Sequence, residues 1–325
     1  MSENTNIEWC DHTFNGWEGC QHAGPGCDNC YAEARNKRFG GGVAVNWGPG
    51  APRRRTSAAN WTLPLKWNRR AGIMQSAWAN GVALHGGDEA ACIAAGFFKP
   101  QRPKVFCSSL ADVFDNAVDP MWRADLFALI AQTQNLDWLL LTKRIGNVKP
   151  MLEAIRHSSD EDLSLLDMMP MPNVWLGATI VNQAEADRDI PKLLAVPAEK
   201  RFLSMEPLLG PINIRDRIYR FHCGDCDHDF NCVDETVRPR LECPVCGNDQ
   251  VEDNQADVDW VIVGGESGHN ARPMHPDWAR SLRDQCQSAG VPFMVKQWGE
   301  WREALEGEEF DTWLQWKKTH LLKPR

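Results

Sequence analysis

The sequence lacks any run of about 20 consecutive apolar residues, which is the length that a membrane-spanning helix needs. Its first residues, MSENTNIEWC, also lack the basic-then-apolar pattern of a secretory signal. We therefore expect a cytoplasmic protein with no membrane segment. The chain has 325 residues, of which 43% are hydrophobic and 9% aromatic, so it is long enough to bury a full core in one large domain or two smaller ones.

Acidic residues are missing from one long stretch, although the net charge of the whole chain is −9. Between Glu33 and Asp88 there are nine lysines and arginines and no carboxylate, so the remainder of the chain carries −18. Tryptophans alternate with these cations, a combination expected where phosphates and unstacked bases are held together. The predicted nucleic-acid contacts are Arg53, Arg54, Arg55, Trp61, Lys66, Trp67, Arg69 and Arg70. The alternative is a solvated basic loop whose tryptophans reach back into the core.

Internal repeats and low-complexity tracts are also absent, and a β-then-α order emerges instead. Short apolar runs predict buried parallel strands at 104–109, 137–144, 173–180, 200–207, 258–268 and 291–299. Helical patterns lie between several of them, at 119–134, 182–197 and 275–290. Residues 34–102 are rich in Gly, Pro, Trp and Arg, which predicts a long irregular insertion. This order favours an α/β fold, either a (β/α) barrel or a doubly wound sheet.

Polar residues cluster where the predicted strands end. They are Ser108, Ser109 and Asp112; Thr142, Lys143 and Arg144; Thr179 and Asn182; Ser204 and Glu206; Glu266 and Ser267; Lys296 and Gln297. In a barrel the carboxyl ends of all strands converge on one face, so these groups would enter a single site. The clustering therefore favours a partial or complete TIM-like barrel.

The 12 cysteines need an explanation other than disulfides, because the cytoplasm is reducing. Cys223-x2-Cys226 and Cys243-x2-Cys246 are sixteen residues apart, which is the spacing of a four-cysteine zinc ribbon. The residues around them make a poor hydrophobic core, so Zn²⁺ would supply much of the module's stability. The ribbon either has a purely structural role or extends a nucleic-acid surface.

A second cysteine group, Cys20, Cys27 and Cys30, has the spacing C-x6-C-x2-C and precedes a helix-like segment. Zinc would need a fourth donor, for which His22, His12 and Cys10 are candidates. A [4Fe-4S] cluster could instead use three thiolates and leave one iron open for an exogenous ligand. The spacing by itself leaves both alternatives open.

Several motifs extend this pattern along nearly the whole chain: GCDNCYAE, SSLADVFD, LLLTKR, VWLGATI, RFLSMEPLLGPI, VIVGGESGHNARPMHPDW and PFMVKQWGEW. In this order they resemble a family of radical-SAM-like proteins common in bacteriophages and prophages, within the radical S-adenosylmethionine (SAM) superfamily. The chain departs from the usual superfamily pattern of C-x3-C-x2-C, because Asn29 stands where an aromatic residue is usual and Tyr31 follows the last cysteine.

The resemblance implies a barrel of the radical SAM type in residues 1–215 and 257–325, with the basic insertion at 34–102 and the zinc ribbon at 216–256. It implies that Cys20, Cys27 and Cys30 bind the [4Fe-4S] cluster. Lys143, Glu206 and Lys296 are the implied catalytic residues. The implied cofactor contacts are Tyr31, Ser108, Ser109, Asp112, Thr179, Asn182, Glu206, Gly264, Gly265 and Glu266.

Each of these roles has a structural alternative. Glu206 could form a salt bridge with Lys143 or Arg144, and these two cations could equally hold a methionine carboxylate or a DNA phosphate. Thr179 and Asn182 could be ordinary helix caps. Lys296 could belong to a polar cluster that closes the barrel.

The resemblance also implies a function. We expect a monomeric radical SAM enzyme that isomerises a modified thymine in phage DNA within the host cytoplasm, as in thymidine hypermodification. Its radical would form after reduction by an external donor such as flavodoxin or ferredoxin. A repair enzyme similar to spore photoproduct lyase is an alternative, with Cys107 as hydrogen donor. A non-enzymatic, zinc-stabilised nucleic-acid-binding protein is another.

Overall fold

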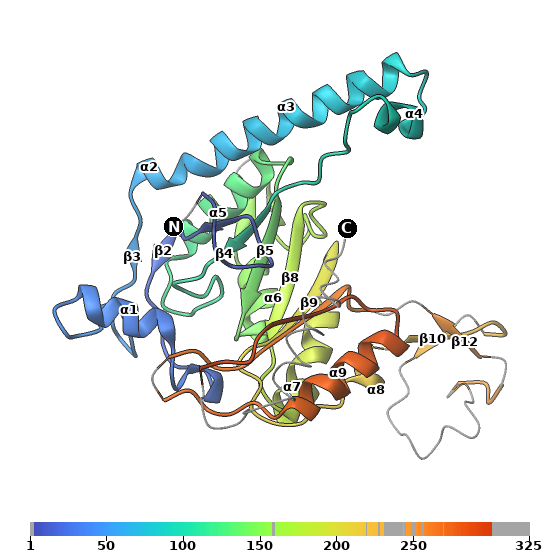
Figure 1. The fold of residues 1–325 in the computed structure, drawn as a ribbon. Helices are drawn as coiled ribbons and strands as arrows, with labels where there is room; N and C mark the ends of the chain where they lie inside the picture. Colours follow the sequence, from blue (N-terminus) through green and yellow to red (C-terminus); the bar gives the residue numbers. More distant parts are fainter. Residues whose placement is uncertain are drawn as a thin grey trace, which may run out of the picture.

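The computed structural model describes residues 3–157, 160–218, 220–226, 228–230, 243, 245–248, 251–254, 257–268 and 270–300. Its centre is a seven-stranded sheet, curled into a half-barrel (Figure 1). The strands are β1 (His12–Phe14), β4 (Lys104–Cys107), β5 (Asp137–Thr142), β8 (Val174–Thr179), β9 (Lys200–Met205), β13 (Trp260–Gly264) and β14 (Phe293–Gln297). Each predicted strand contains one of them.

The order of strands across the sheet is the same as their order along the chain. Every neighbouring pair is parallel. A doubly wound sheet would reverse its order at a switch point, whereas a barrel adds each new strand on the same side. The α/β prediction and the partial TIM-like architecture are therefore confirmed, and the doubly wound alternative is wrong.

Helices cover the outer, convex face of the half-barrel (Figure 1). They are α5 (Pro120–Gln132), α6 (Ile145–Glu153), α7 (Gln183–Leu194), α8 (Arg215–Ile218) and α9 (Pro276–Ser288). Local caps set where the longer ones begin. Asp119 accepts a hydrogen bond from the backbone N–H of Met121, and Pro120 supplies a φ angle suited to the first turn. The three helices predicted from sequence are confirmed.

Successive side chains along each strand point to opposite faces of the sheet, which divides the core into two layers. Val105 and Cys107 of β4 face the helices, while Phe106 between them faces the inside of the half-barrel. The inner layer is largely aromatic and contains Trp9, Phe106, Leu139, Trp175, Phe202, Trp260, Ile262 and Met294. Two residues further along three of these strands come Ser108, Ser204 and Lys296, so the floor is apolar and the mouth is polar.

The insertion at 34–102 is more regular than predicted. It contains β3 (Arg54–Arg55), α2 (Ala58–Trp61), α3 (Leu63–Leu84) and α4 (Glu89–Ala94). Pro64 lies in the first turn of α3, and Trp67 and Ala71, four residues apart, are buried on one face. Beyond Ala71 the helix leaves the body and packs on α4, forming a projecting arm (Figure 1). The prediction of an irregular insertion is therefore wrong for this helical part.

The remaining elements are short. They are β2 (Trp17–Glu18), η1 (Pro25–Cys27), α1 (Tyr31–Phe39), β6 (Arg156–His157), β7 (Asp160–Ser164), β10 (Arg220–Cys223), β11 (His228–Phe230) and β12 (Val251–Asn254). The last three form an antiparallel sheet between β9 and β13 in the sequence. Residues 301–325 of the predicted final segment, and parts of 216–256, lie outside the described residues. Within the described ranges, no helix combines the length and hydrophobicity needed to cross a bilayer.

Candidate metal and cofactor site

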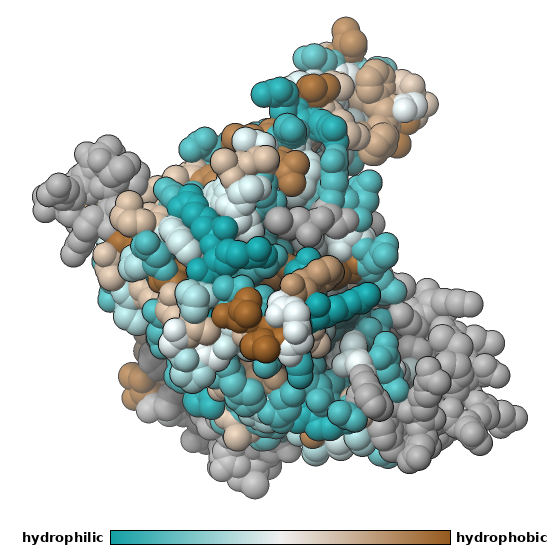
Figure 2. Space-filling model, turned by 90° about the vertical axis from the view of Figure 1, so that its left-hand side faces the viewer, coloured by the Kyte–Doolittle hydropathy of each residue, from teal (hydrophilic) through white to brown (hydrophobic). Residues whose placement is uncertain are grey.

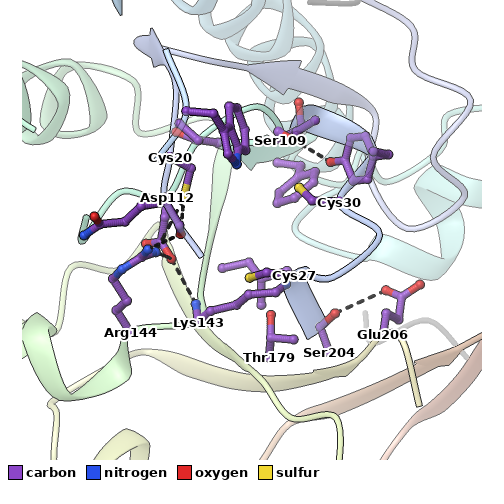
Figure 3. Close-up of a pocket in the computed structure, with 18 of the residues that line it drawn as sticks. Cys20, Cys27, Cys30, Ser109, Asp112, Lys143, Arg144, Thr179, Ser204 and Glu206 are labelled. Atoms are coloured by element: carbon purple, nitrogen blue, oxygen red, sulfur yellow. Dashed lines mark hydrogen bonds and ion pairs between the residues drawn. The ribbon is translucent and has the colours of Figure 1, made fainter. Parts of the chain in front are cut away.

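A pocket opens at the carboxyl ends of the parallel strands, where the sequence predicts a site. The side chains of Cys20, Cys27 and Cys30 line it, and Figure 3 shows their sulfurs around an open centre. Strand ends supply most of the opposite wall. The loop that carries the cysteines therefore covers the mouth of the half-barrel.

Local structure fixes each cysteine differently. Cys20 follows β2 and forms an isolated parallel bridge with Trp47. Cys27 ends the short helix η1, and Cys30 is the N-cap residue of α1. Trp47 also lines the pocket, although it lies in the insertion far from the strand ends in sequence. Sequence reasoning missed this role, because a tryptophan in a glycine-rich stretch gives no sign of where it packs.

The three thiols do not converge on one ion. Four sulfurs around a single tetrahedral zinc lie about 4 Å apart, whereas a cluster distributes its thiolates over separate irons. Among the described residues, only Cys223, Cys226, Cys243 and Cys246 form a group of possible ligands whose atoms all lie within 4.8 Å of one another. The arrangement of the N-terminal triple thus fits a cluster better than a closed zinc site.

The candidates for a fourth zinc donor point to the same conclusion. His12 stacks on Trp67 at 4.3 Å between ring centroids, and Cys10 is buried in the inner apolar layer. His22 pairs with Asp28 at 2.8 Å. None of the three candidates lines the pocket.

Burial controls the protonation of the thiols. It raises the pKa of Cys20 to about 12, with the nearby Asp112 carboxylate adding to the effect, and it also raises the pKa of Cys30. Arg144 opposes the shift at Cys20, since its Nη1 donates to Sγ at 3.5 Å. Cys20 and Cys30 are therefore protonated at neutral pH, so a metal that bound them would have to displace their protons.

Asp112 organises the ends of two neighbouring strands. Its Oδ1 accepts from Phe114 N at 2.9 Å and Thr142 Oγ1 at 2.7 Å. Its Oδ2 accepts from Lys143 N at 3.0 Å and Arg144 Nη1 at 3.0 Å. Protein donors contact both oxygens and fix the carboxylate in place; Asp112 also lines the pocket, and its predicted contact with the cofactor stays a prediction.

Several polar groups in the pocket lack partners within the described part of the chain, among them the indole N–H of Trp9 and the side chains of Thr179 and Lys143. The hydroxyl of Thr179 is buried and makes no hydrogen bond there. The side chain of Lys143 makes no ion pair with any described carboxylate, and Figure 3 shows it beside Cys27. A buried hydroxyl without a partner costs free energy, so Thr179 and Lys143 fit a polar, anionic ligand.

Glu206 and Lys296 form an ion pair on the other side of the pocket. Lys296 Nζ lies 3.0 Å from Glu206 Oε1, and Ser204 Oγ donates to Oε2 at 3.2 Å. The alternative that paired Glu206 with Lys143 or Arg144 is wrong, since Arg144 pairs with Asp112 instead. Both members of the Glu206–Lys296 pair remain accessible to a ligand, because they line the pocket.

Tyr31, Ser108 and Ser109 line the wall of the pocket. The Tyr31 hydroxyl donates to the carbonyl of Ser109 at 2.6 Å, and Ser109 Oγ accepts from Asn15 at 3.0 Å. Ser108 Oγ lies 3.3 Å from the sulfur of Cys107. These contacts connect α1 to the end of β4.

Other predicted cofactor contacts lie outside the pocket. Asn182 caps α7 by accepting from Glu185 N at 2.9 Å, which is the alternative role considered for it. A Cβ on Gly264 would lie 2.6 Å from Glu206 Oε1, and one on Gly265 would lie 1.7 Å from the carbonyl of Trp298. Both glycines therefore serve close packing. Neither lines the pocket, and the predicted cofactor contact of both glycines stays a prediction.

Glu266 also faces away from the pocket. Its carboxylate pairs with Arg272 at 2.6 Å and accepts from Asn29 at 2.9 Å. These hydrogen bonds lower the pKa of Glu266, although burial alone would raise it. The residue connects the cysteine loop to the end of β13, and its predicted contact with the cofactor stays a prediction.

Two residues of the predicted nucleic-acid surface are buried. The Arg53 side chain is 1% exposed and pairs with the fully buried Asp115 at 2.6 Å. Trp67 is 3% exposed. Neither side chain can reach a phosphate or a base, so the prediction is wrong for both.

The other cations lie on the surface. Three are paired with carboxylates: Arg54 with Glu18, Arg55 with Asp125 and Arg70 with Glu3. The Trp61 ring lies 4.5 Å from the Arg55 guanidinium. Lys66 and Arg69 of α3 are exposed and form no ion pair with a described residue. Figure 2 shows a mostly hydrophilic surface on the side that carries α1 and β3, with the end of the arm above it.

The second cysteine group has the geometry of a metal site. Cys223 and Cys246 sulfurs are 3.5 Å apart, and those of Cys226 and Cys243 are 3.6 Å apart. Although burial opposes it, hydrogen bonds from the backbone N–H groups of Cys246 and Val245 lower the pKa of Cys243 to about 6. The four residues together can hold a metal such as zinc.

Comparison with known proteins adds one relationship. No curated protein and no solved structure matches the chain. A family model described as "Protein of unknown function (DUF5131)" matches residues 4–319, which is nearly the whole sequence. The chain therefore belongs to the DUF5131 family.

Proposed function

We propose that this protein is a radical SAM enzyme that acts on a nucleic-acid base. The observation that carries the proposal is the placement of Cys20, Cys27 and Cys30 around one pocket at the mouth of a parallel half-barrel. Their sulfurs are not arranged for a single ion, and none of the histidine and cysteine candidates for a fourth zinc donor lines the pocket. A [4Fe-4S] cluster with one open iron satisfies both conditions.

The polar groups of the pocket suit the second cofactor. SAM carries a carboxylate, an amine, a ribose and an adenine. Lys143 would pair with the carboxylate, and Thr179 would donate to or accept from a polar group of the ligand. The Glu206–Lys296 pair offers an acceptor and a donor together, which suits a ribose hydroxyl or a substrate amine.

The aromatic floor of the half-barrel strengthens these contacts. Phe106 and Trp9 belong to the inner apolar layer and line the pocket, where they would limit the access of water. Electrostatic interactions are stronger in such a low-dielectric environment. When bound and reduced by a donor such as flavodoxin or ferredoxin, the cluster and SAM would supply a 5′-deoxyadenosyl radical that abstracts a substrate hydrogen. The protein's task is then to position the reacting groups and keep water out.

The substrate that we propose is a modified thymine in DNA, which the enzyme would isomerise. Lys66 and Arg69 on α3 have no ion-pair partner among the described residues and could bind phosphates. An enzyme that acts on a base inside a duplex must also take it out of the stack. The metal site between β9 and β13 would hold zinc and stabilise its small module.

Metal analysis tests the proposal. Protein purified without oxygen is expected to contain about four iron, about four sulfide and about one zinc per chain, with the brown absorption of a cluster. Incubation with SAM and a reductant is then expected to release 5′-deoxyadenosine. Only zinc in the protein, even after anaerobic reconstitution with iron and sulfide, would refute the radical mechanism.

That negative result would favour a second function, a non-enzymatic nucleic-acid-binding protein stabilised by zinc. The four-cysteine site supports it directly, since such ribbons need no catalytic partner. It predicts a colourless protein that binds DNA with a strong salt dependence.

The repair-lyase alternative has less support. Its hydrogen donor was expected to be Cys107, but this residue is buried in the outer layer that packs against the helices. It does not line the pocket. The choice of Cys107 as hydrogen donor is therefore wrong.

A further inference from the structure

We infer that Arg144 and Arg272 are positioning residues that hold the cysteine loop, residues 20–30, in its cluster-binding shape. The two arginines follow different strands and donate hydrogen bonds to backbone carbonyls in different parts of the loop, at Gln21 and Pro25. Of these two arginines only Arg144 contacts a cysteine sulfur, so it would also contribute positive charge beside the cluster. This inference rests on the proposed function.

Arg144 holds the first part of the loop. Its side chain is 9% exposed, and Nη2 donates to the carbonyl of Gln21 at 2.5 Å. Nη1 lies 3.5 Å from Cys20 Sγ and 3.0 Å from Asp112 Oδ2. Asp112 is itself fixed by hydrogen bonds from Phe114 N and from Thr142 at the end of β5, so the guanidinium is held rigidly against the sulfur.

Arg272 holds the second part of the loop from the segment after β13. Nη2 donates to the carbonyl of Pro25 at 2.8 Å, and Nη1 donates to Asp28 at 2.8 Å. The same guanidinium pairs with Glu266, which also accepts from Asn29 at 2.9 Å. The residues on both sides of Cys27 are thereby anchored, although no atom of Arg272 contacts a thiol.

The two contact patterns predict different consequences. Partners that orient metal ligands typically change metal affinity by about 10–100-fold when they are removed. Loss of either arginine should therefore lower iron occupancy. Loss of a positive charge next to a ligand also makes it harder to add an electron, so only the Arg144 variant should move the reduction potential to a more negative value.

The experiment compares Arg144→Gln, Arg272→Gln and the control Arg188→Gln under anaerobic conditions. Arg188 is an exposed arginine of α7 that pairs with Asp189 and makes no contact with the loop. Iron and zinc per chain are measured at limiting iron, together with the midpoint potential of the bound cluster. We expect iron to fall several-fold in both loop variants, with zinc unchanged and the control equal to wild type.

Conservative variants separate positioning from loss of fold. Arg144→Lys and Arg272→Lys retain the charge but lose the two-pronged hydrogen bonding, so iron should fall while the potential of Arg144→Lys stays near that of wild type. Unchanged iron in both glutamine variants would overturn the inference, as would equal potentials in Arg144→Gln and Arg272→Gln. Zinc lost in parallel with iron from both lysine variants would also overturn it, because the arginines would then support the fold as a whole. Absence of iron from the wild-type protein is a different result, which refutes the proposed function itself.

Discussion

Replacing Arg53 by methionine should strongly destabilise the protein, because it leaves a buried carboxylate without its counterion. Arg53 Nε and Asp115 Oδ2 are 2.6 Å apart, and the two side chains are 1% and 0% exposed. The guanidinium also donates to the carbonyl of Ala51 at 2.8 Å. Removing one partner of such a pair lowers the free energy of unfolding by about 3–5 kcal/mol, mostly because the other charge stays buried without a counterion.

Urea unfolding at fixed zinc concentration measures this loss as a change in the free energy of unfolding. The double variant Arg53→Met with Asp115→Asn should recover about 2 kcal/mol or more, since the uncompensated charge is gone. The matched control is Arg54→Gln, whose side chain is 65% exposed and whose ion pair contributes at most about 1 kcal/mol. A loss below about 1 kcal/mol in Arg53→Met, or no recovery in the double variant, would refute the reasoning.

Three further predictions concern ligands and pH. Replacing Lys66 and Arg69 by glutamine should weaken DNA binding and reduce the slope of log affinity against log salt concentration by about 2. Fluorescence titration at several salt concentrations would measure this slope. An unchanged slope would exclude the two residues as phosphate contacts. In cluster-loaded protein, Thr179→Val should weaken SAM binding about fivefold and Lys143→Met about tenfold or more by calorimetry, and equal affinities would contradict their placement in the cofactor site. Because its pKa is lowered in the folded protein, Glu266 stabilises the fold at pH values above the ordinary glutamate pKa of about 4.3. That contribution is lost as the pH falls through the lowered pKa, so the difference in unfolding free energy between wild type and Glu266→Gln should shrink toward zero in acid. A difference that stays constant with pH would contradict this.

The strands were predictable because buried parallel strands have a simple pattern in the sequence. Both faces of such a strand are covered, so it reads as a short continuous apolar run that ends in polar residues. LLLTKR shows this directly, since β5 ends at Thr142 and the following Lys143 reaches the pocket. The position of the site followed from the same rule, because the carboxyl ends of parallel strands meet on one face.

The fate of individual charges was not predictable, because it depends on partners distant in sequence. Arg53 and Arg54 are neighbours in one basic run, yet one is buried against Asp115 and the other is exposed beside Glu18. Only the fold brings Asp115 to within hydrogen-bonding distance. Glu266 shows the same dependence, because its carboxylate also accepts a hydrogen bond from Asn29, which is distant in the sequence.

The half-barrel explains why one loop can carry so much of the proposed chemistry. Three strands, β4, β9 and β14, each supply an apolar residue to the floor and, two residues later, a polar residue to the mouth, as Phe106 with Ser108 and Phe202 with Ser204 illustrate. The sheet thus provides a dry base and a polar rim but none of the three pocket cysteines. The thiols come from the loop that precedes α1, which is held by arginines from the ends of β5 and β13. A change at either strand end therefore acts on the thiols through this loop, even where it touches no sulfur.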